Sequence, residues 1–140
     1  MKNGSVILEL QRATHATLQR LAADLAGLGL TASDLNALGN LADGTARTVS
    51  ELCTAVGTKP ATMTGVLDRL ESRGLITRAA RPGDRRAVVI QLTRDGVQAA
   101  TRVRRTMDDL ERRALADLPA GALDGARAVL RALAEAEAGP

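Results

Sequence analysis

The strongest constraint in this sequence is a change of hydrophobic period near its middle. Up to Gly74, and again from Thr93, apolar residues recur every three or four positions, which is typical of amphipathic helices. Between these regions, residues 75–80 and 87–92 form two short runs with strand character. The intervening residues, 81–86, contain Pro-Gly and favour a tight turn. The chain is therefore predicted to be mainly α with a small β-hairpin, α+β by strict count.

Six helices are predicted, four before the hairpin and two after it. Thr31 is placed as the N-cap of the second helix, and Thr48 with Glu51 fits a capping box for the third, although Ser50 is an alternative cap. Pro60 opens the fourth helix. The long helices outside this central part are predicted over residues 6–28, 93–118 and 120–137.

The third and fourth helices have the spacing of a helix-turn-helix. Cys53 is small enough to let the two helices approach, and Gly57 suits the turn between them. The second of these helices has an inward apolar stripe that consists of Met63, Val66, Leu67 and Leu70. A basic hairpin follows directly, so residues of about 31–92 are predicted to form a winged helix-turn-helix.

Positive charge is concentrated in the same part of the chain. Residues 59–94 hold eight basic and three acidic residues, a net charge of +5, whereas the remainder carries −2. A basic surface in an otherwise balanced chain is expected of a protein that binds a polyanion. The alternative is charge that only keeps the protein soluble.

Composition argues against several other classes of function. The chain has no Phe, Tyr or Trp, which removes aromatic platforms for single-stranded nucleic acid. One His and one Cys make a zinc site within one chain improbable, and no catalytic triad or phosphate-binding glycine loop is apparent. We therefore expect no enzyme activity, no cofactor and no metal. The absence of a signal-like start or a long apolar run predicts a cytoplasmic protein without a membrane partner.

Three blocks of sequence carry a resemblance to a known family. They are Thr48-Val49-Ser50-Glu51-Leu52, residues 66–78, and Asp84-Arg85-Arg86 continuing to Leu92-Thr93-Arg94-Asp95-Gly96. On these blocks the chain resembles the MarR family of bacterial transcriptional regulators over nearly its whole length. The resemblance implies one domain over residues 1–140 and a homodimer that binds a pseudo-palindromic operator in double-stranded DNA. It also implies a regulator that is most often a repressor. Members of the family often release DNA when a small molecule binds to them.

The fourth helix is expected to enter the major groove of DNA. Thr62 and Thr64 are placed to meet base edges, and Lys59 and Arg69 to meet phosphates, with Arg73 assigned to the same surface. Many relatives carry a long polar side chain where this chain has a glycine, at position 65. That glycine either permits close approach to DNA or weakens sequence discrimination.

The hairpin supplies a second predicted contact with DNA. By resemblance, Arg86 reaches the minor groove, while Arg85 and Arg81 lie nearer the phosphates. Asp84 is expected to orient Arg86, or another arginine such as Arg78, through a charge-assisted hydrogen bond.

The outer helices have long apolar faces that a single chain of this size would struggle to cover. We expect a second copy to cover them. The residues assigned to dimerisation are Leu18, Leu21, Leu25, Met107, Leu110, Leu123, Leu130 and Leu133.

Two single residues have more than one interpretation. Cys53 is interpreted as a packing residue, with redox sensing as the alternative. His15 is interpreted as an interface or packing residue, with ligand binding or pH sensing as the alternative. An effector pocket would have to be aliphatic, with at most an arginine for a carboxylate. A weakly specific architectural DNA-binding protein is the alternative to a specific regulator.

Overall fold

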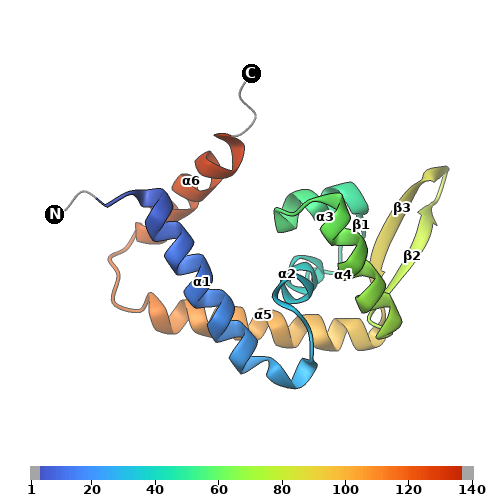
Figure 1. The fold of residues 1–140 in the computed structure, drawn as a ribbon, viewed down its shortest axis with the longest axis horizontal. Coiled ribbons are helices and arrows are strands. Elements are labelled where there is room, and N and C mark those ends of the chain that lie inside the picture. Colours follow the sequence, from blue (N-terminus) through green and yellow to red (C-terminus); the bar gives the residue numbers. More distant parts are fainter. Residues whose placement is uncertain (1–3, 137–140) are drawn as a thin grey trace. The chain divides into compact units, whose positions relative to one another are not determined.

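The computed structural model describes residues 4–136, apart from the side chain of Arg85, and divides into two compact units, Met1–Asp108 and Asp109–Pro140. In chain order the elements are α1 Val6–Asp24, η1 Ala26–Leu28, α2 Ala32–Leu41, β1 Arg47–Thr48, α3 Val49–Val56, α4 Pro60–Ser72, β2 Ile76–Arg81, β3 Asp84–Leu92, α5 Arg94–Ala114 and α6 Ala122–Glu135 (Figure 1). The mainly helical fold with a small β wing is confirmed. The organisation as one domain stays a prediction.

Local sequence signals explain where the central helices begin. Thr31 caps α2 and Thr48 caps α3, and in each helix the carboxylate three positions later accepts a hydrogen bond from the backbone amide of the cap residue. These reciprocal bonds satisfy amide groups that have no partner within the helix. The alternative cap at Ser50 is excluded, because α3 already begins at Val49.

The ends of the central helices follow from glycine. Gly57 ends α3 with a φ of 77°, a left-handed conformation that other residues adopt at a cost. After α4, Gly74 has a φ of 72°, and the amide of Leu75 donates to the carbonyl of Leu70 at 2.9 Å. This pattern is a Schellman ending. It turns the chain directly from α4 into β2.

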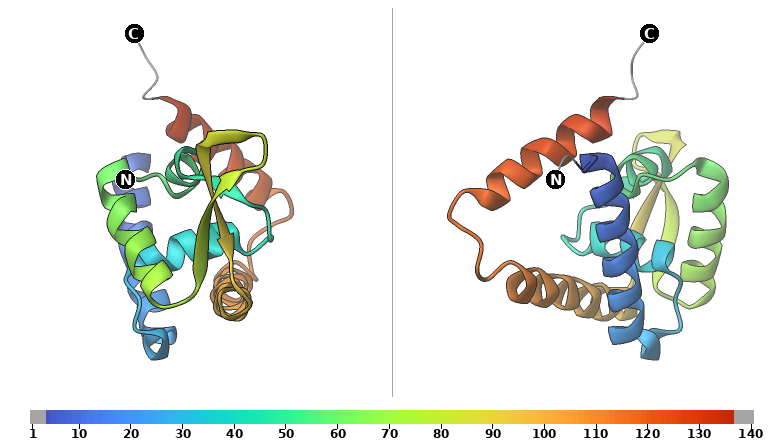
Figure 2. Two further views of the ribbon diagram at one scale, coloured as in Figure 1. Left: turned by 90° about the vertical axis from the view of Figure 1, so that its right-hand side faces the viewer. Right: turned by 60° about the vertical axis from the view of Figure 1, so that its left-hand side comes forward.

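The sheet has three antiparallel strands in the order β1-β3-β2. Strand β1 was not predicted, and it pairs Arg47 with Ile90 and Thr48 with Val89. Because Thr48 also caps α3, this short strand joins the start of the helix-turn-helix to the wing. The β2–β3 hairpin extends past the neighbouring helices (Figures 1 and 2).

The core of the first unit lies between α2, α3, α4, the sheet and the first half of α5 (Figure 2). The predicted inward stripe of α4 is confirmed, since its four residues are at most 1% exposed. Its largest partners from other elements are Leu38, Leu41, Leu52, Ile76 and Ile90. Burying an aliphatic side chain of this size stabilises a fold by about 1.5–3 kcal/mol. The core thus fixes α4 on one face and leaves the other face free.

A close backbone approach joins the wing to α5. A Cβ atom on Gly96 would lie 1.8 Å from the carbonyl oxygen of Leu75, so only glycine fits there. Thr93 donates its hydroxyl to the carbonyl of Gly74 at 2.6 Å and accepts from the amide of Gly96 at 3.0 Å. The Thr-x-x-Gly sequence therefore attaches the start of α5 to the start of the wing.

The buried face of α5 differs from the predicted stripe at its start. The helical spacing of Val97, Ala100 and Val103 predicts a shared apolar stripe, but Val97 is 51% exposed, and the buried positions are Gly96, Ala99, Ala100 and Val103. The close contact at Gly96 sets the rotation of the helix and turns Val97 outward. The helix ends at Ala114, earlier than the predicted residue 118.

Helices α1 and α6 have exposed apolar side chains. Among the residues that the structure describes, neither helix contains a buried one. Val6, Ile7 and Leu8 at the start of α1 are 55–70% exposed, and Leu123 and Leu130 of α6 are 39% and 48% exposed. Across residues 4–136, helices long and apolar enough to cross a lipid bilayer are absent.

Candidate nucleic-acid interface

The free face of α4 is the first part of the candidate site. Thr62 and Thr64 are exposed in its first half, as is Lys59 at its N-cap. The hydroxyl of Thr64 donates to the carbonyl of Pro60 at 3.1 Å and keeps its acceptor lone pair available. Side chains that can accept, donate or meet a methyl group thus lie where a base edge would be read.

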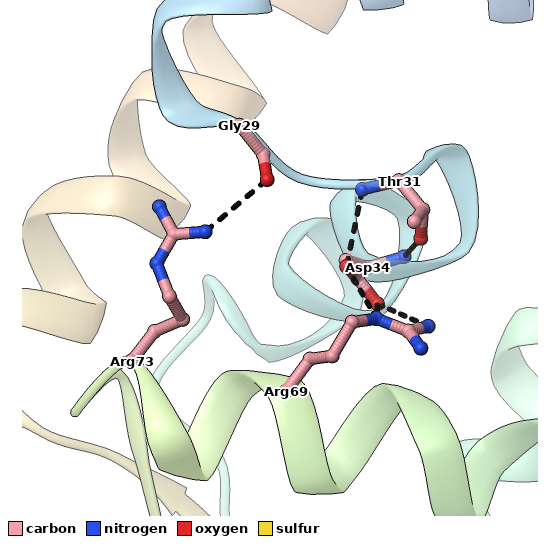
Figure 3. A network of polar contacts seen from close by, with 5 residues as sticks. All are labelled: Gly29, Thr31, Asp34, Arg69 and Arg73. Atoms are coloured by element: carbon pink, nitrogen blue, oxygen red, sulfur yellow. Dashed lines mark hydrogen bonds and ion pairs between the residues drawn. The ribbon is translucent and has the colours of Figure 1, made fainter.

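Arg69 is held by a buried carboxylate on α2 (Figure 3). Its Nε and Nη2 donate to Asp34 at 3.0–3.2 Å, and Asp34 is completely buried. Asp34 also accepts from the amide of Thr31 at 3.1 Å. The hydrogen bonds from Arg69 to Asp34 raise the pKa of the guanidinium above its usual value. Arg69, predicted to be a phosphate contact, therefore has a structural partner within the chain.

The signal for this ion pair was present in the sequence. Asp34 lies four and seven residues before Leu38 and Leu41, on the same stripe of α2, and all three are buried. A carboxylate on an apolar stripe needs a cationic partner. The pattern did not reveal which arginine supplies it.

Arg73 also binds within the chain. Its guanidinium donates to the carbonyls of Leu28 at 2.5 Å and Gly29 at 3.1 Å, in the segment before α2. The Gly29 contact is drawn in Figure 3. Gly29 has a φ of 63°, which turns this segment back toward α2. Arg73, assigned to DNA from the sequence, is thus a helix-to-loop contact in this structure.

Arg78 has a different partner from the one predicted. It donates to Asp68 at 2.9 Å and to Glu71 at 2.7 Å, both on α4. These hydrogen bonds raise the pKa of Arg78. The expected pairing of Arg78 with Asp84 is therefore wrong, because β2 leaves α4 directly and places Arg78 beside the acids of that helix.

The wing has a tighter turn than predicted. Arg81 pairs with Asp84 across Pro82-Gly83, and the next pair is Ala80 with Val88. Residues 85–87 therefore form a bulge on β3. A bulge redirects side chains out of the ladder. The exposed Arg86 belongs to this bulge, whereas the side chain of Arg85 lies outside the part of the chain that the structure describes.

Asp84 orients the wing through the backbone. Its Oδ1 accepts from the amide of Arg86 at 3.0 Å, which fixes the main chain at the residue expected to reach the minor groove. The predicted bond to the guanidinium is replaced by this local one. Arg81 lies 3.6 Å from the carboxylate of Glu51 on α3 and so connects the wing to the helix-turn-helix.

An uncharged cavity lies between α1, α2 and α5. It has a volume of about 250 Å³, and its lining comprises Thr14, Thr17, Leu18 and Leu21 of α1, Ala32, Leu35 and Asn36 of α2, and Met107 of α5. Leu18, Leu21, Leu35 and Met107 make much of this lining apolar. An arginine is not among the described residues that line it.

The structure places the other predicted residues as follows. Leu25 was assigned to dimerisation but is 1% exposed in the core of this chain, because it packs inward where α1 ends. Leu21 and Met107 are half-buried against the same core, whereas Leu18 is 37% exposed. In the second unit, Leu110 and Leu133 are half-buried. Cys53 packs against the core, in line with its packing interpretation, and His15 is exposed on α1.

Comparisons with known proteins agree with this architecture. Residues 28–87 match the sequence model of the MarR family. The HTH-type transcriptional repressor NicR of Pseudomonas putida is 40% identical over 47 residues, which are 34% of this chain and 30% of that repressor. The chain thus covers under a third of the length of this curated relative.

Two solved structures share the fold over nearly the whole chain. S. aureus MepR in its DNA-binding conformation has a TM-score of 0.85 at 20% identity, covering 95% of this chain and 98% of that one. CouR from Rhodococcus jostii, bound to p-coumaroyl-CoA, has a TM-score of 0.83 at 24% identity, covering 93% and 92%. At these identities the likeness establishes the fold. Residues 28–87 thus match the MarR family, and nearly the whole chain shares the winged helix-turn-helix fold of these two structures.

Proposed function

We propose that this protein is a homodimeric regulator of transcription, in the repressor class, that binds double-stranded DNA sequence-specifically. The proposal rests on two features of the structure, the exposed face of α4 and the exposed Arg86 in the wing. The core holds α4 by its buried stripe and leaves Thr62 and Thr64 exposed, while the β3 bulge presents Arg86. A helix in the major groove and an arginine in the minor groove together read bases and groove width.

A second copy of the chain is the proposed cover for the apolar residues of α1 and α6. The exposed side chains at the start of α1 and on α6 would otherwise remain in water. Two copies related by a twofold axis would carry two recognition helices, so the operator should contain two half-sites about one helical turn apart. A dimer would thus require a pseudo-palindromic site.

The cavity between α1, α2 and α5 is the proposed site for a small-molecule effector. Aliphatic side chains form most of its wall, and Thr14, Thr17 and Asn36 supply the polar atoms. CouR holds an acyl-CoA, an anionic ligand. The uncharged lining favours a small neutral molecule for this chain.

A weakly specific architectural role is the second candidate, and the surface of α4 favours it. The outward side chains near Gly65 are short, and the long side chain of Arg69 is engaged with Asp34. A Cβ atom on Gly65 would lie 3.3 Å from Nη1 of Arg69, so this glycine also gives the guanidinium room. The ratio of specific to non-specific affinity distinguishes the two candidates, since a specific regulator reaches about 10³ or more.

The decisive experiment is selection of bound duplexes from a random pool with the full-length protein. A specific repressor should enrich a pseudo-palindrome with half-site centres about 10 bp apart. The affinity for that duplex should fall roughly 10³–10⁵-fold between about 50 and 200 mM salt if 6–10 phosphates are neutralised. Recovery of unrelated sequences with equal affinity would support the architectural role, and no binding at low salt would overturn both candidates.

A further inference from the structure

The guanidinium of Arg69 lies against α4 at Gly65. A Cβ atom on Gly65 would lie 3.3 Å from Nη1 of Arg69, so the glycine leaves room for that nitrogen. In Figure 3 the guanidinium points away from Arg73, and therefore toward the first half of α4. Gly65 and Arg69 are four residues apart and lie on the same side of the helix. An arginine from the second half of α4 thus extends toward the half that is expected to meet base edges.

Asp34 fixes the orientation of this guanidinium. Nε of Arg69 donates to Oδ1 of Asp34 at 3.2 Å and to Oδ2 at 3.1 Å, and Nη2 donates to Oδ1 at 3.0 Å. Asp34 is completely buried, so moving Arg69 away would leave a buried carboxylate without a counter-ion, which is costly. Because the fold already holds the Arg69 side chain, binding to it costs little further side-chain entropy.

One edge of the guanidinium stays available for another acceptor. An arginine carries its N–H donors in a rigid, planar fork. The bonds to Asp34 use the side of the fork formed by Nε and Nη2, and Nη1 takes no part in them. The end of the fork, with one N–H on Nη1 and one on Nη2, is left as a parallel pair of donors. The Arg69 side chain is 48% exposed, so an acceptor from outside the chain can reach it.

The acceptor that best fits this free edge is a guanine base. In the major groove, guanine presents two adjacent acceptors, O6 and N7, whereas adenine presents one acceptor beside a donor. A phosphate also presents two oxygens, but it is attracted chiefly by charge. Arg69 and Asp34 together carry no net charge, so the pair attracts a phosphate less than a free arginine would. Its hydrogen bonds to an uncharged base edge are unaffected by that neutralisation.

We propose that Arg69 recognises a guanine in each half-site through its free edge, with Asp34 as the positioning residue and Gly65 as the gap that admits the guanidinium. This inference rests on the proposed function and names a base that the operator contains. It replaces the expectation that Arg69 contacts a phosphate. Recognition of guanine would also favour the specific regulator over the architectural candidate.

The test replaces the guanines of the selected duplex, one at a time, by 7-deazaguanine. This base keeps its Watson–Crick pairing but lacks the N7 acceptor. One replacement in each half-site should weaken binding by the wild-type protein about fivefold or more, because a bidentate contact distinguishes bases by at least that factor. A selected site without guanine, or one in which the loss of N7 changes no affinity, would overturn the proposal.

A variant without the ion pair assigns the contact to Arg69. Asp34→Asn with Arg69→Gln keeps two amide side chains and removes both charges. In this variant the 7-deazaguanine penalty should fall below about twofold, and the slope of log affinity against log salt should stay as in the wild type. If Arg69 bound a phosphate instead, the penalty would persist and the slope would fall by about one unit per contact. That result would overturn the proposal.

Asp34→Asn alone tests the positioning role. The variant keeps Arg69 but frees its guanidinium, so the 7-deazaguanine penalty should fall, and the salt dependence should become steeper because the arginine is no longer neutralised. The matched control is Asp43→Asn, which removes the same charge from an exposed pair with Arg47 and should keep the wild-type penalty. A wild-type penalty in Asp34→Asn would exclude the positioning role.

Gly65→Leu keeps the proposal testable if the variants of Asp34 do not fold. The substitution places a side chain in the gap beside Nη1, on the surface of α4, and leaves the buried ion pair unchanged. The 7-deazaguanine penalty should fall below about twofold in this variant as well. A penalty as large as that of the wild type would contradict the proposal.

A failure of the proposed function is distinguishable from a failure of this inference. If the wild-type protein binds no duplex, the proposed function fails and the inference falls with it. If it binds the selected duplex tightly but tolerates 7-deazaguanine at every position, only the inference fails.

Discussion

Replacing Gly96 by alanine should destabilise the protein through one backbone contact. The new Cβ atom would lie 1.8 Å from the carbonyl oxygen of Leu75 and 3.2 Å from Cδ2 of Leu92. Cβ atoms stay at least 3.0 Å from such neighbours, so α5 and the start of the wing must separate by more than an ångström. The carbonyl of Leu75 also accepts from the amide of Thr93 at 3.0 Å, and that bond is lost when the two segments part.

The size of the effect follows from three contributions. Overpacking of this kind costs about 1–3 kcal/mol. The bonds from Thr93 to the carbonyls of Leu75 and Gly74 are worth about 0.5–1.5 kcal/mol each. Alanine returns about 0.5–1 kcal/mol through its better helix propensity. The free energy of unfolding should therefore fall by about 3 kcal/mol, which corresponds to a loss of roughly 10 °C in the melting temperature.

The assay is urea unfolding followed by circular dichroism, with Gly125→Ala as the control. Gly125 lies within α6, and among the described residues nothing approaches its Cβ position within 4 Å. The control should therefore be stabilised by about 0.5–1 kcal/mol. If both variants change stability by the same amount, the close approach does not explain why glycine occupies position 96.

Three further predictions concern the wing, a helix cap and the dimer. Arg86→Ala should weaken binding to the selected duplex by about 1–3 kcal/mol. The control Arg104→Ala, on α5, should leave that binding unchanged. Equal losses of affinity in the two variants would remove Arg86 from the interface. The amide of Thr48 donates a hydrogen bond to Glu51, which holds the pKa of that carboxyl below its usual 4.5. The carboxylate therefore stabilises the fold above pH 4.5, and this stabilisation is lost as the pH falls through the lower pKa of Glu51 in the folded protein. Unfolding should therefore be easier for Glu51→Gln than for wild type at neutral pH, and equally easy once the pH is low enough to protonate Glu51 in the folded protein. A difference that does not change with pH would contradict the cap. If the protein forms the proposed dimer, Leu130→Glu should convert it to monomers in sedimentation velocity. Dimers of this variant would exclude α6 from the proposed interface.

The parts of the fold that the sequence predicts are those governed by neighbours in the chain. The cap at Thr48 depends on Glu51 three residues later, and the ending at Gly74 depends on the residues around it. The buried stripe of α4 repeats at helical spacing. In each case the energetic cause lies within about one helical turn, so the pattern is visible before the fold is known.

The parts that it does not predict depend on distant pairings. Asp34 and Arg69 are separated by 35 positions, and Arg47 pairs with Ile90 in a strand too short to have a periodic signal. The direction of Arg78 follows from how β2 leaves α4. Consequently the sequence did not show that Arg69 and Arg78 are engaged by carboxylates of the same chain, Asp34 for the first and Asp68 with Glu71 for the second.

Sedimentation of the protein with duplexes that carry one or two half-sites measures how many protomers each duplex binds. We propose that paired copies of this chain present two recognition helices and two wings to DNA. The duplex with two half-sites should bind two protomers in one step, and moving its half-sites apart by about 5 bp, half a helical turn, should abolish tight binding. Stable binding of a single protomer, or equal binding at both spacings, would exclude recognition of DNA by paired copies.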